Sequence, residues 1–453
     1  MFSLDDVARA IGGRREGRRA SVVPSGFSVD SRRVQPGDLF FALPGARVDG
    51  HAFVGDAFAR GAVAAVVSDL SVAASDQAEL IWVDDVRRGL VSLARAWRER
   101  LSAPLVGVTG SNGKTTTKAL LAHLLGGPPA SYASPENYNT EVGVPLALLS
   151  MPETAAVGVL ELAADRPGDL APLADLVRPS AALITSVGPS HLDGFGTVDA
   201  VATEKWTLAE AINPGGWVLA NADSPQLRER AAAGLRAELV TVGLEHGDVR
   251  GHIQQAVPLV LRVERPRLAL STNLLGAHNA TNVLLAALAA LRLGASAADV
   301  ERRAATFGPA AHRMERRRAR FGVVLDDVYN ANPSSVAAAL DVLVGCRAAG
   351  QAVFIFGDML GLGEGSARLH DETVRRALSL AVDAIYPVGE AAAAAARRVG
   401  DPRILVLPRE RVAVHVAKRL ADTTDAAVLV KGSRGVGLES LVDELLRLAP
   451  YSA

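Results

Sequence analysis

Cysteine is almost absent from this chain of 453 residues, in which Cys346 stands alone. A single cysteine can form neither an intramolecular disulfide nor a metal site built from several thiolates, so both are excluded. Its scarcity fits a reducing compartment. Aromatic residues are also few, at 4% of the chain, but hydrophobic residues as a whole make up 49%. That proportion is enough for packed cores and excludes a disordered chain.

The chain also lacks an excess of either charge, since 48 Lys and Arg stand against 49 Asp and Glu. Affinity for a phosphate backbone comes from excess Lys and Arg, so we expect no nucleic-acid partner. Long apolar runs are missing too: the run at 283–291 is about half of the ~20 residues that cross a bilayer. The first residues are acidic and do not resemble a signal peptide. We therefore expect a cytoplasmic protein without membrane insertion.

Short apolar runs alternate with helical patterns along the chain, in three groups. The first group predicts a small α/β domain over 1–103. The second predicts a central domain over 104–310, because continuous apolar strands that alternate with helices are typical of a mostly parallel sheet covered on both faces. The third predicts a C-terminal, Rossmann-like doubly wound domain over 311–453. The expected fold class is α/β, with three consecutive domains.

The pattern gives the following elements. The expected strands are 39–43, 63–67, 80–83, 105–109, 157–162, 181–187, 217–220, 323–326, 353–356, 384–388, 404–407 and 427–430. The expected helices are 51–60, 115–125, 198–212, 279–293, 297–307, 336–343 and one that contains 391–396.

A glycine-rich loop joins strand 105–109 to the helix that follows, with the sequence G-S-N-G-K-T-T-T. Glycines let the backbone curl so that several N–H groups point inward, and the helix N-terminus adds a positive dipole end. Lys114 would then reach the β- and γ-phosphates, and the Thr115 hydroxyl is placed for Mg²⁺. Val108 stands where the strict motif has glycine, and the alternative is a tight turn with an exposed lysine. The context predicts that this P-loop-type domain binds ATP or GTP.

Three polar residues follow at intervals on neighbouring elements. Glu161 ends an apolar strand, His191 lies in a Gly/Pro-rich loop, and Lys205 lies on the next helix. Taken separately, they could be an edge carboxylate, a loop histidine and a solvated lysine. Beside a phosphate loop, a functional role for these residues is favoured, because Mg²⁺ bound to nucleotide phosphates takes one or two carboxylate ligands from nearby strand ends.

Together, these motifs resemble the Mur ligase family, the ATP-dependent amide-forming enzymes of peptidoglycan precursor synthesis. The loop resembles the family's ATP motif over Thr109, Gly110, Ser111, Asn112, Gly113, Lys114, Thr115 and Thr116. The segment N-T-E-V-G-V-P from Asn139 resembles its next motif, and G-A-H-N-A-T-N at 276–282 resembles the segment near the adenine. The resemblance implies that Glu161 and His191 bind Mg²⁺, with two ions expected. It also implies that Lys205 is carbamylated by CO₂ and becomes an anionic metal ligand.

Both ends of the chain resemble particular members of the family. Two N-terminal motifs resemble a UDP-sugar-binding domain: Asp30, Ser31 and Arg32, then Asp49, Gly50 and His51. Third-domain motifs resemble the members that join D-alanyl-D-alanine to UDP-N-acetylmuramoyl-tripeptide: D-D-V-Y-N-A-N-P at 326–333, G-D-M-L at 357–360 and K-G-S-R-G at 431–435. The resemblance implies dipeptide binding by Asp327, Tyr329, Asn330, Asn332, Lys431, Ser433 and Arg434. We find no D-N-P-R motif, which the diaminopimelate-adding relative uses. We expect a monomer.

Several further residues have two explanations. His278, Asn279 and Asn282 either cap the helix that they begin or contact adenine, and Asn139 has a similar ambiguity. Arg313 either pairs with a phosphate across the domain boundary or forms a surface salt bridge. Asp326 follows a strand, where it could hold ribose. His123 and His415 are interpreted as structural.

The implied reaction is phosphorylation of the tripeptide's terminal carboxylate by ATP, followed by attack of the dipeptide amine on the acyl phosphate. Such an intermediate must be kept from water, so we expect the third domain to close on the second around 309–310. The chain departs from the family at 165–166 and 206–207, beside the expected metal ligands. Two alternatives are therefore kept: a relative that adds a single amino acid, and a nucleotide-binding homologue without catalysis.

Overall fold

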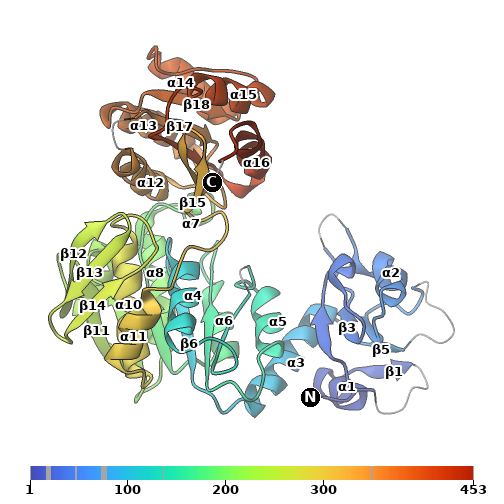
Figure 1. Cartoon of the computed structure of the whole chain (residues 1–453). Coiled ribbons are helices and arrows are strands. Elements are labelled where there is room, and N and C mark those ends of the chain that lie inside the picture. The colour runs from blue at the N-terminus through green and yellow to red at the C-terminus, as the bar shows by residue number, and fades with distance from the viewer. Residues whose placement is uncertain are drawn as a thin grey trace.

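A computed structural model describes residues 2–16, 22–45, 48–72, 79–135, 137–347 and 350–451. These residues form three α/β bodies (Figure 1), so the predicted fold class is confirmed. The first and third bodies contact different sides of the central one. Among the described helices, none combines the length and the apolar character that crossing a membrane requires.

The N-terminal body is a five-stranded sheet in the order β1-β5-β4-β3-β2, parallel except for β1. Its strands are β1 (Arg14–Glu16), β2 (Gly26–Ser28), β3 (Asp38–Phe41), β4 (Ala64–Val67) and β5 (Leu80–Trp82). Its helices are α1 (Leu4–Ile11), η1 (Ser31–Arg33), η2 (Gly50–Phe53), α2 (Val54–Ala59) and α3 (Val86–Arg100). The expected helix 51–60 is thus a 3₁₀ turn continued by α2.

The central body is a nine-stranded sheet in the order β14-β13-β12-β11-β10-β9-β6-β8-β7. Its strands are β6 (Leu105–Thr109), β7 (Ser131–Ala133), β8 (Val157–Glu161), β9 (Ala181–Ile184), β10 (Trp217–Asn221), β11 (Glu238–Gly243), β12 (Val249–Ala256), β13 (Leu259–Val263) and β14 (Leu268–Ser271). The strands from β7 to β12 are parallel, as expected, whereas β12, β13 and β14 are antiparallel. The sequence analysis missed this antiparallel edge, because β12 is exposed along most of its length and lacks an apolar run.

Helices cover both faces of the central sheet. They are α4 (Lys114–Leu124), α5 (Gly143–Leu149), α6 (Leu170–Val177), α7 (Leu192–Phe195), α8 (Val198–Glu210), α9 (Pro225–Ala232), α10 (Asn279–Arg292) and α11 (Ala297–Ala304). Residues of α4, α10 and α11 share one core with Val106 and Val108 of β6. Residues of α5, α6 and α8 share the other core with Leu105. This alternation along one strand is what a sheet buried on both faces requires.

The C-terminal body is a five-stranded sheet in the order β15-β16-β19-β17-β18, parallel except for β15. Its strands are β15 (Glu315–Ala319), β16 (Gly322–Asp327), β17 (Ala352–Gly357), β18 (Ala384–Val388) and β19 (Ala426–Lys431). Its helices are α12 (Pro333–Cys346), η3 (Gly363–Gly365), α13 (Ser366–Ser379), α14 (Glu390–Val399), α15 (Arg409–Arg419), η4 (Arg434–Val436) and α16 (Glu439–Leu448). Two cores, one on each face, give the predicted doubly wound arrangement.

The predicted strand at 404–407 is wrong. Its pairing within the described chain is a single bridge between Ile385 and Ile404. Pro402 and Pro408 flank the segment and leave too short a run for a ladder. Its apolar side chains pack against the two cores instead, which is why the sequence resembles a strand.

Candidate active site

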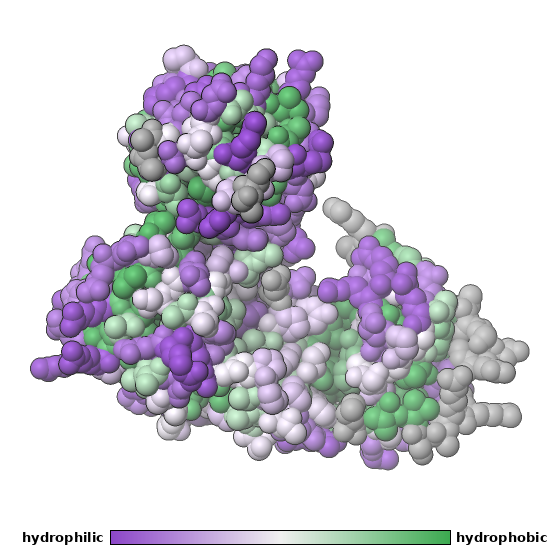
Figure 2. Space-filling view, in the orientation of Figure 1, coloured by the Kyte–Doolittle hydropathy of each residue, from purple (hydrophilic) through white to green (hydrophobic). Residues whose placement is uncertain are grey.

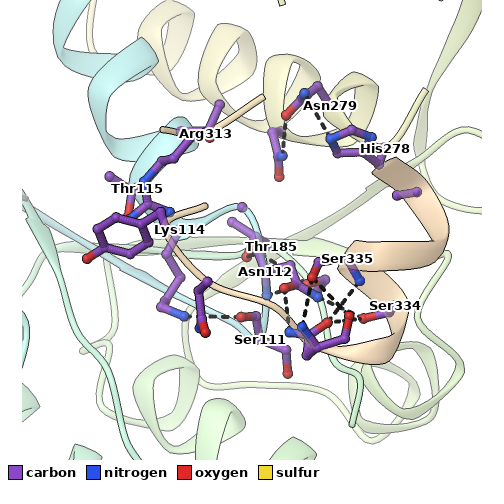
Figure 3. A pocket seen from close by; sticks show the side chains of 18 of the residues that line it. Ser111, Asn112, Lys114, Thr115, Thr185, His278, Asn279, Arg313, Ser334 and Ser335 are labelled. Atoms are coloured by element: carbon purple, nitrogen blue, oxygen red, sulfur yellow. Dashed lines mark hydrogen bonds between the residues drawn. The ribbon is translucent and has the colours of Figure 1, made fainter. Parts of the chain in front are cut away.

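A cavity of about 700 Å³ lies between the central and C-terminal bodies. It opens at the carboxyl ends of the central parallel strands, where α/β sheets place their ligand sites. Figure 3 shows Ser334 and Ser335 of α12 lying against the loop that carries Ser111 and Asn112, with His278 and Asn279 apart from them. Segments more than 200 residues apart in the sequence therefore form one pocket.

The glycine-rich loop curls as predicted between β6 and α4. Gly110 has φ +145° and Gly113 has φ +82°, both in the range that favours glycine. A Cβ at Gly113 would collide with Asn282, so the loop could not pack against α10 with any other residue. The Lys114 ammonium donates to the carbonyls of Gly110 at 2.7 Å and Ser111 at 3.3 Å. Burial lowers the pKa of Lys114.

Glu161, at the end of β8, is held by several donors. The Thr115 hydroxyl donates to its Oε2 at 2.8 Å, and the Asn139 amide donates to its Oε1 at 2.9 Å. Lys118 Nζ lies 3.5 Å from Oε2. Burial acts to raise the pKa of Glu161, but the charges of Lys114 and Lys118 and these hydrogen bonds outweigh it, so the pKa is lowered. The result is an ionised carboxylate beside the phosphate loop. The sequence analysis did not name Lys118.

His191 lies in the pocket wall. It has φ +51°, and its Nδ1 lies 3.4 Å from an oxygen of Asp165. Burial lowers the pKa of His191, which favours the neutral imidazole that a metal ligand requires. Asp165, one of the two departures at 165–166, is therefore a pocket residue and the partner of His191.

Lys205 lies just behind this wall, 2% exposed, and is not one of the described residues that line the cavity. Its Nζ donates to the Ala164 carbonyl at 2.9 Å and sits 5.6 Å from the centre of the Phe195 ring. Burial lowers its pKa to about 7, with a further contribution from the charge of Lys114. The neighbouring departure, Trp206, is buried in the core of α5, α6 and α8 and is not among the described lining residues.

The segment 278–282 forms the opposite wall. The Asn279 amide donates to the Leu275 carbonyl at 2.8 Å, and the Asn282 amide donates to Asn279 Oδ1 at 3.1 Å. His278 is the N-cap of α10, and within the described chain it makes no side-chain capping bond, so capping by its side chain is not its role. Burial lowers the pKa of His278. Apolar side chains complete this wall, namely Leu244, Leu274, Ala277 and Ala338.

The C-terminal body contributes two arginines whose guanidinium groups lie near the ring of Tyr329. The Arg313 guanidinium carbon lies 3.6 Å from the centre of the Tyr329 ring, and that of Arg434 lies 5.4 Å from it. Arg313 Nε is buried and has no hydrogen-bond partner in the described part of the chain. Lys431 Nζ donates to Asp327 Oδ2 at 2.7 Å and to the Asn330 carbonyl at 2.8 Å. This network fixes the segment 327–330 at the cavity.

Two hydrogen bonds that are donated by side-chain amides connect the central and C-terminal bodies. Asn332 Nδ2 donates to Asn112 Oδ1 at 2.8 Å, and Asn112 Nδ2 donates to Ser334 Oγ at 2.9 Å. Asn332 also caps α12 through a bond from the Ser335 N–H. The same residues therefore begin the helix and contact the phosphate loop.

Some expected site residues lie elsewhere among the described residues. Asp326, expected to bind ATP, is fully buried, bonds to His312 and does not line the cavity, whereas its neighbour Asp327 does. Successive side chains of a strand point to opposite faces, so only one of the two can reach the pocket. Thr109, Gly110, Ser433 and Arg434 are not among the described residues that line the cavity. Ser433 donates to the Ala331 carbonyl at 3.3 Å.

The expected UDP-sugar residues form two turns in the N-terminal body and do not reach the described cavity lining. Asp30 caps η1 and pairs with Arg32 at 2.8 Å, and Ser31 is buried. Asp49 caps η2, which begins at Gly50, and lies 2.7 Å from His51 Nδ1. His51 Nε2 accepts from the Ser68 N–H at 2.9 Å. Each motif has a structural role in this arrangement.

The sequence analysis missed several lining residues, among them Thr185, Ser186, Asn221 and Ser334. Thr185 directly follows β9, which neighbours β6 in the sheet, and Asn221 ends β10, the next strand beyond β9. The end of the predicted strand 217–220 points to Asn221, whereas the predicted strand 181–187 runs past Thr185 and hides it. Ser334 gives no such signal, because its position depends on how two domains meet.

Comparisons with known proteins match all three bodies. Family models match residues 25–98 (Mur ligase family, catalytic domain), 108–290 (Mur ligase middle domain) and 312–434 (Mur ligase, glutamate ligase domain). A curated relative from Bacillus subtilis (strain 168), UDP-N-acetylmuramoyl-tripeptide–D-alanyl-D-alanine ligase, is 30% identical and covers 93% of each chain.

Two solved structures are similar over nearly the whole chain. A crystal structure of MurF from Acinetobacter baumannii is 27% identical, with a TM-score of 0.88 over 98% of this chain and 99% of that one. The crystal structure of MurF ligase from Thermotoga maritima in complex with ADP is 27% identical, with a TM-score of 0.81 over 93% and 97%.

Proposed function

Because this chain belongs to the Mur ligase family, we propose that it uses ATP to join D-alanyl-D-alanine to UDP-N-acetylmuramoyl-tripeptide. The product is the pentapeptide precursor of peptidoglycan. One observation carries the proposal: a phosphate loop, an ionised Glu161 and Arg313 converge on a single cavity between two domains. The relatives with this activity match the chain from end to end, which favours the dipeptide-adding reaction over addition of a single amino acid.

The reaction needs activation of a carboxylate, whose oxygen is a poor leaving group. ATP transfers its γ-phosphoryl group to the terminal carboxylate of the tripeptide, forming an acyl phosphate and ADP. The dipeptide amine then attacks the acyl carbon, the C–O bond breaks, phosphate leaves and the amine loses a proton. Lys114 and Arg313, from opposite sides of the domain boundary, stabilise the charge that develops on the phosphoryl oxygens.

The residues around Glu161 fit Mg²⁺. The Thr115 hydroxyl and the Glu161 carboxylate, 2.8 Å apart, are the hard oxygen donors that this ion prefers beside nucleotide phosphates. His191 lies in the same wall and supplies a neutral nitrogen. When bound, the ion would neutralise phosphate charge. In this arrangement Asn139 orients Glu161 through its 2.9 Å hydrogen bond.

Carbamylation of Lys205 is part of the proposal. CO₂ reacts only with a neutral amine, and the buried position of Lys205 favours that form. The amine bonds to the Ala164 carbonyl, one residue from Asp165 and close to His191. A carbamate would place a negative charge behind that wall, near the cations that surround Glu161. Two further parts of the proposal are a chain that acts as a monomer and a third domain that closes on ATP.

The ATP site divides into two regions that suit the parts of a nucleotide. The loop and Lys114 face the phosphates, while the apolar wall with Asn279 and Asn282 suits a base. The incoming dipeptide would meet Asn330 and the Asp327–Lys431 pair on the other side. A nucleotide-binding homologue without catalysis would have no need for an ionised Glu161 held by two donors, so we favour the enzyme.

The test is phosphate release from ATP and Mg²⁺ with UDP-N-acetylmuramoyl-tripeptide, with and without D-alanyl-D-alanine, using each common third residue of the tripeptide. Release that depends on the dipeptide is expected. Lys205→Ala should abolish it, and added short-chain carboxylates should restore part of it. Release without dependence on the dipeptide, for every tripeptide, would contradict the assignment. Loss in Lys205→Ala without rescue would contradict only the carbamate.

A further inference from the structure

Three side chains that the proposed reaction does not use converge where the C-terminal body begins. His312 follows the linker, Glu315 starts β15 and Asp326 lies opposite on β16. Each offers a donor atom, and these atoms all lie within 4.8 Å of one another. His312 Nδ1 is 2.9 Å from Asp326 Oδ2, and the backbone N–H of His312 donates to Glu315 Oε2 at 3.3 Å.

Asp326 is incompletely satisfied in this cluster. Its side chain is fully buried, and its Oδ1 has no hydrogen-bond partner in the ranges that the structure describes. A buried carboxylate oxygen without a partner is costly. Because both oxygens share one carbon, a cation bound at Oδ2 also comes within reach of Oδ1. A bound cation would therefore remove the deficit.

The charge of the three side chains and the backbone conformation of His312 also fit a bound cation. Glu315 and Asp326 together carry two negative charges, which match a divalent ion, and a neutral imidazole adds none. Arg317 lies 3.5 Å from Asp326 Oδ2 and equally far from the exposed Asp443. It can therefore keep its ion pair with Asp443 when a cation binds Asp326. His312 has φ +61°, a conformation that costs a non-glycine residue free energy. The chain thus places an imidazole where glycine would be relaxed.

We propose that His312, Glu315 and Asp326 bind one divalent transition-metal ion of the zinc type. An imidazole nitrogen with two carboxylates suits Zn²⁺ or a similar ion, whereas Mg²⁺ takes most of its ligands from oxygen, including water and phosphate. Tetrahedral bonds of about 2.1 Å place donors about 3.4 Å apart, so the half-buried Glu315 side chain has only a short distance to move. Water would complete the coordination.

The site is distinct from the pocket, because none of its three ligands is among the described residues that line the cavity. It would nevertheless fix the backbone on either side of Arg313, which does line it. An ion here ties the end of the interdomain linker to β15 and β16. The proposal does not depend on the ligase reaction.

The experiment is a calorimetric titration of Zn²⁺ into the full chain, in millimolar Mg²⁺ so that Mg²⁺ sites are filled. We expect one tight Zn²⁺ per chain. His312→Gln should weaken it by about 100-fold, as loss of one ligand of three would. His252→Gln, which changes an exposed histidine on β12, should leave it unchanged. Titration with Co²⁺ should give visible absorption bands that His312→Gln removes.

Three results would overturn the proposal: no tight Zn²⁺ in the parent chain, the same affinity and stoichiometry in His312→Gln, or loss of the ion in His252→Gln. If His312→Gln fails to fold, which circular dichroism would reveal, Glu315→Gln provides the same test from a half-buried strand position. Ligase activity is not the measurement, so a failure of the proposed reaction and a failure of this site would be told apart.

Discussion

The central body meets its two neighbours in different ways. Helix α3 connects it to the N-terminal body through a continuous hydrophobic core, to which Leu90, Leu93 and Trp97 contribute together with α5 and α6. The contact with the C-terminal body combines a cavity, hydrogen bonds between Asn112, Asn332 and Ser334, and a small apolar contribution from Leu275 and Val257. Figure 2 shows the C-terminal body standing on the central one by a narrow contact.

This difference separates a fixed joint from a movable one. Opening the first would expose the apolar face of α3, at about 25 cal/mol for each Å². Opening the second mainly exchanges hydrogen bonds with protein for hydrogen bonds with water, at a net cost of about 1 kcal/mol each, and exposes only the small apolar contact of Leu275 and Val257. Chemistry that must exclude water and then release products requires a joint of the second kind. The predictions below test this contrast.

The largest effect is expected at the apolar joint. The Trp97 ring is 6% exposed, packs edge-on against Phe2 at 5.5 Å and donates to the Met151 carbonyl at 3.1 Å. Trp97→Ala should lower the free energy of unfolding in urea by about 3–5 kcal/mol. Trp217→Ala, which removes a half-buried ring beside Arg292, should lower the free energy of unfolding by clearly less. Equal losses would contradict a special role for α3.

At the polar joint, Lys114→Met should reduce phosphate release by about 10²–10³-fold, equivalent to about 2.7–4 kcal/mol of transition-state stabilisation. Unfolding should change little, because Lys114 bonds to carbonyls of its own loop. Lys418→Met, at an exposed position of α15, is the matched control and should retain full activity. A large loss of stability in Lys114→Met would show that the lysine is structural.

A smaller effect is expected at Tyr329, whose ring contacts Arg313 and Arg434. Tyr329→Leu removes the cation–π contacts, worth about 0.5–2 kcal/mol, and should raise KM for ATP several-fold. Tyr329→Phe retains the ring and should behave as the parent enzyme. If Phe and Leu have the same effect, the hydroxyl rather than the ring positions these arginines.

The smallest effect is expected for Ser334→Ala, which removes the acceptor for the Asn112 amide and one donor to Asn332 Oδ1, while the Ser335 N–H still bonds to the cap of α12. The closed arrangement should lose about 1 kcal/mol. Solution scattering should then report a larger radius of gyration without ATP, and a normal one with it. Ser335→Ala, which affects the cap alone, is the control. One unchanging conformation in every sample would contradict a movable joint.

The parts of the site that follow local rules were predicted from the sequence. The loop at 110–113 is specified by its glycines, and Glu161 by the end of an apolar strand. The sequence did not predict which of Asp326 and Asp327 lines the cavity, because this depends on which face of β16 meets the cavity. The contact of Asn112 with Asn332 joins residues 220 positions apart and depends on how two domains dock. The prediction of a strand at 404–407 was wrong, because an apolar composition alone does not provide a neighbouring strand to hydrogen-bond with.

The core shared through α3 has a consequence for how the chain folds. Side chains from Leu4 to Ala237 belong to one apolar cluster, so the first two bodies cannot lose their packing independently. Cooperative units follow shared cores rather than sheets. The C-terminal body has its own cores, to which the described residues of the central body contribute only Leu275 and Val257. In architecture the protein has three domains, whereas in unfolding it should behave as two.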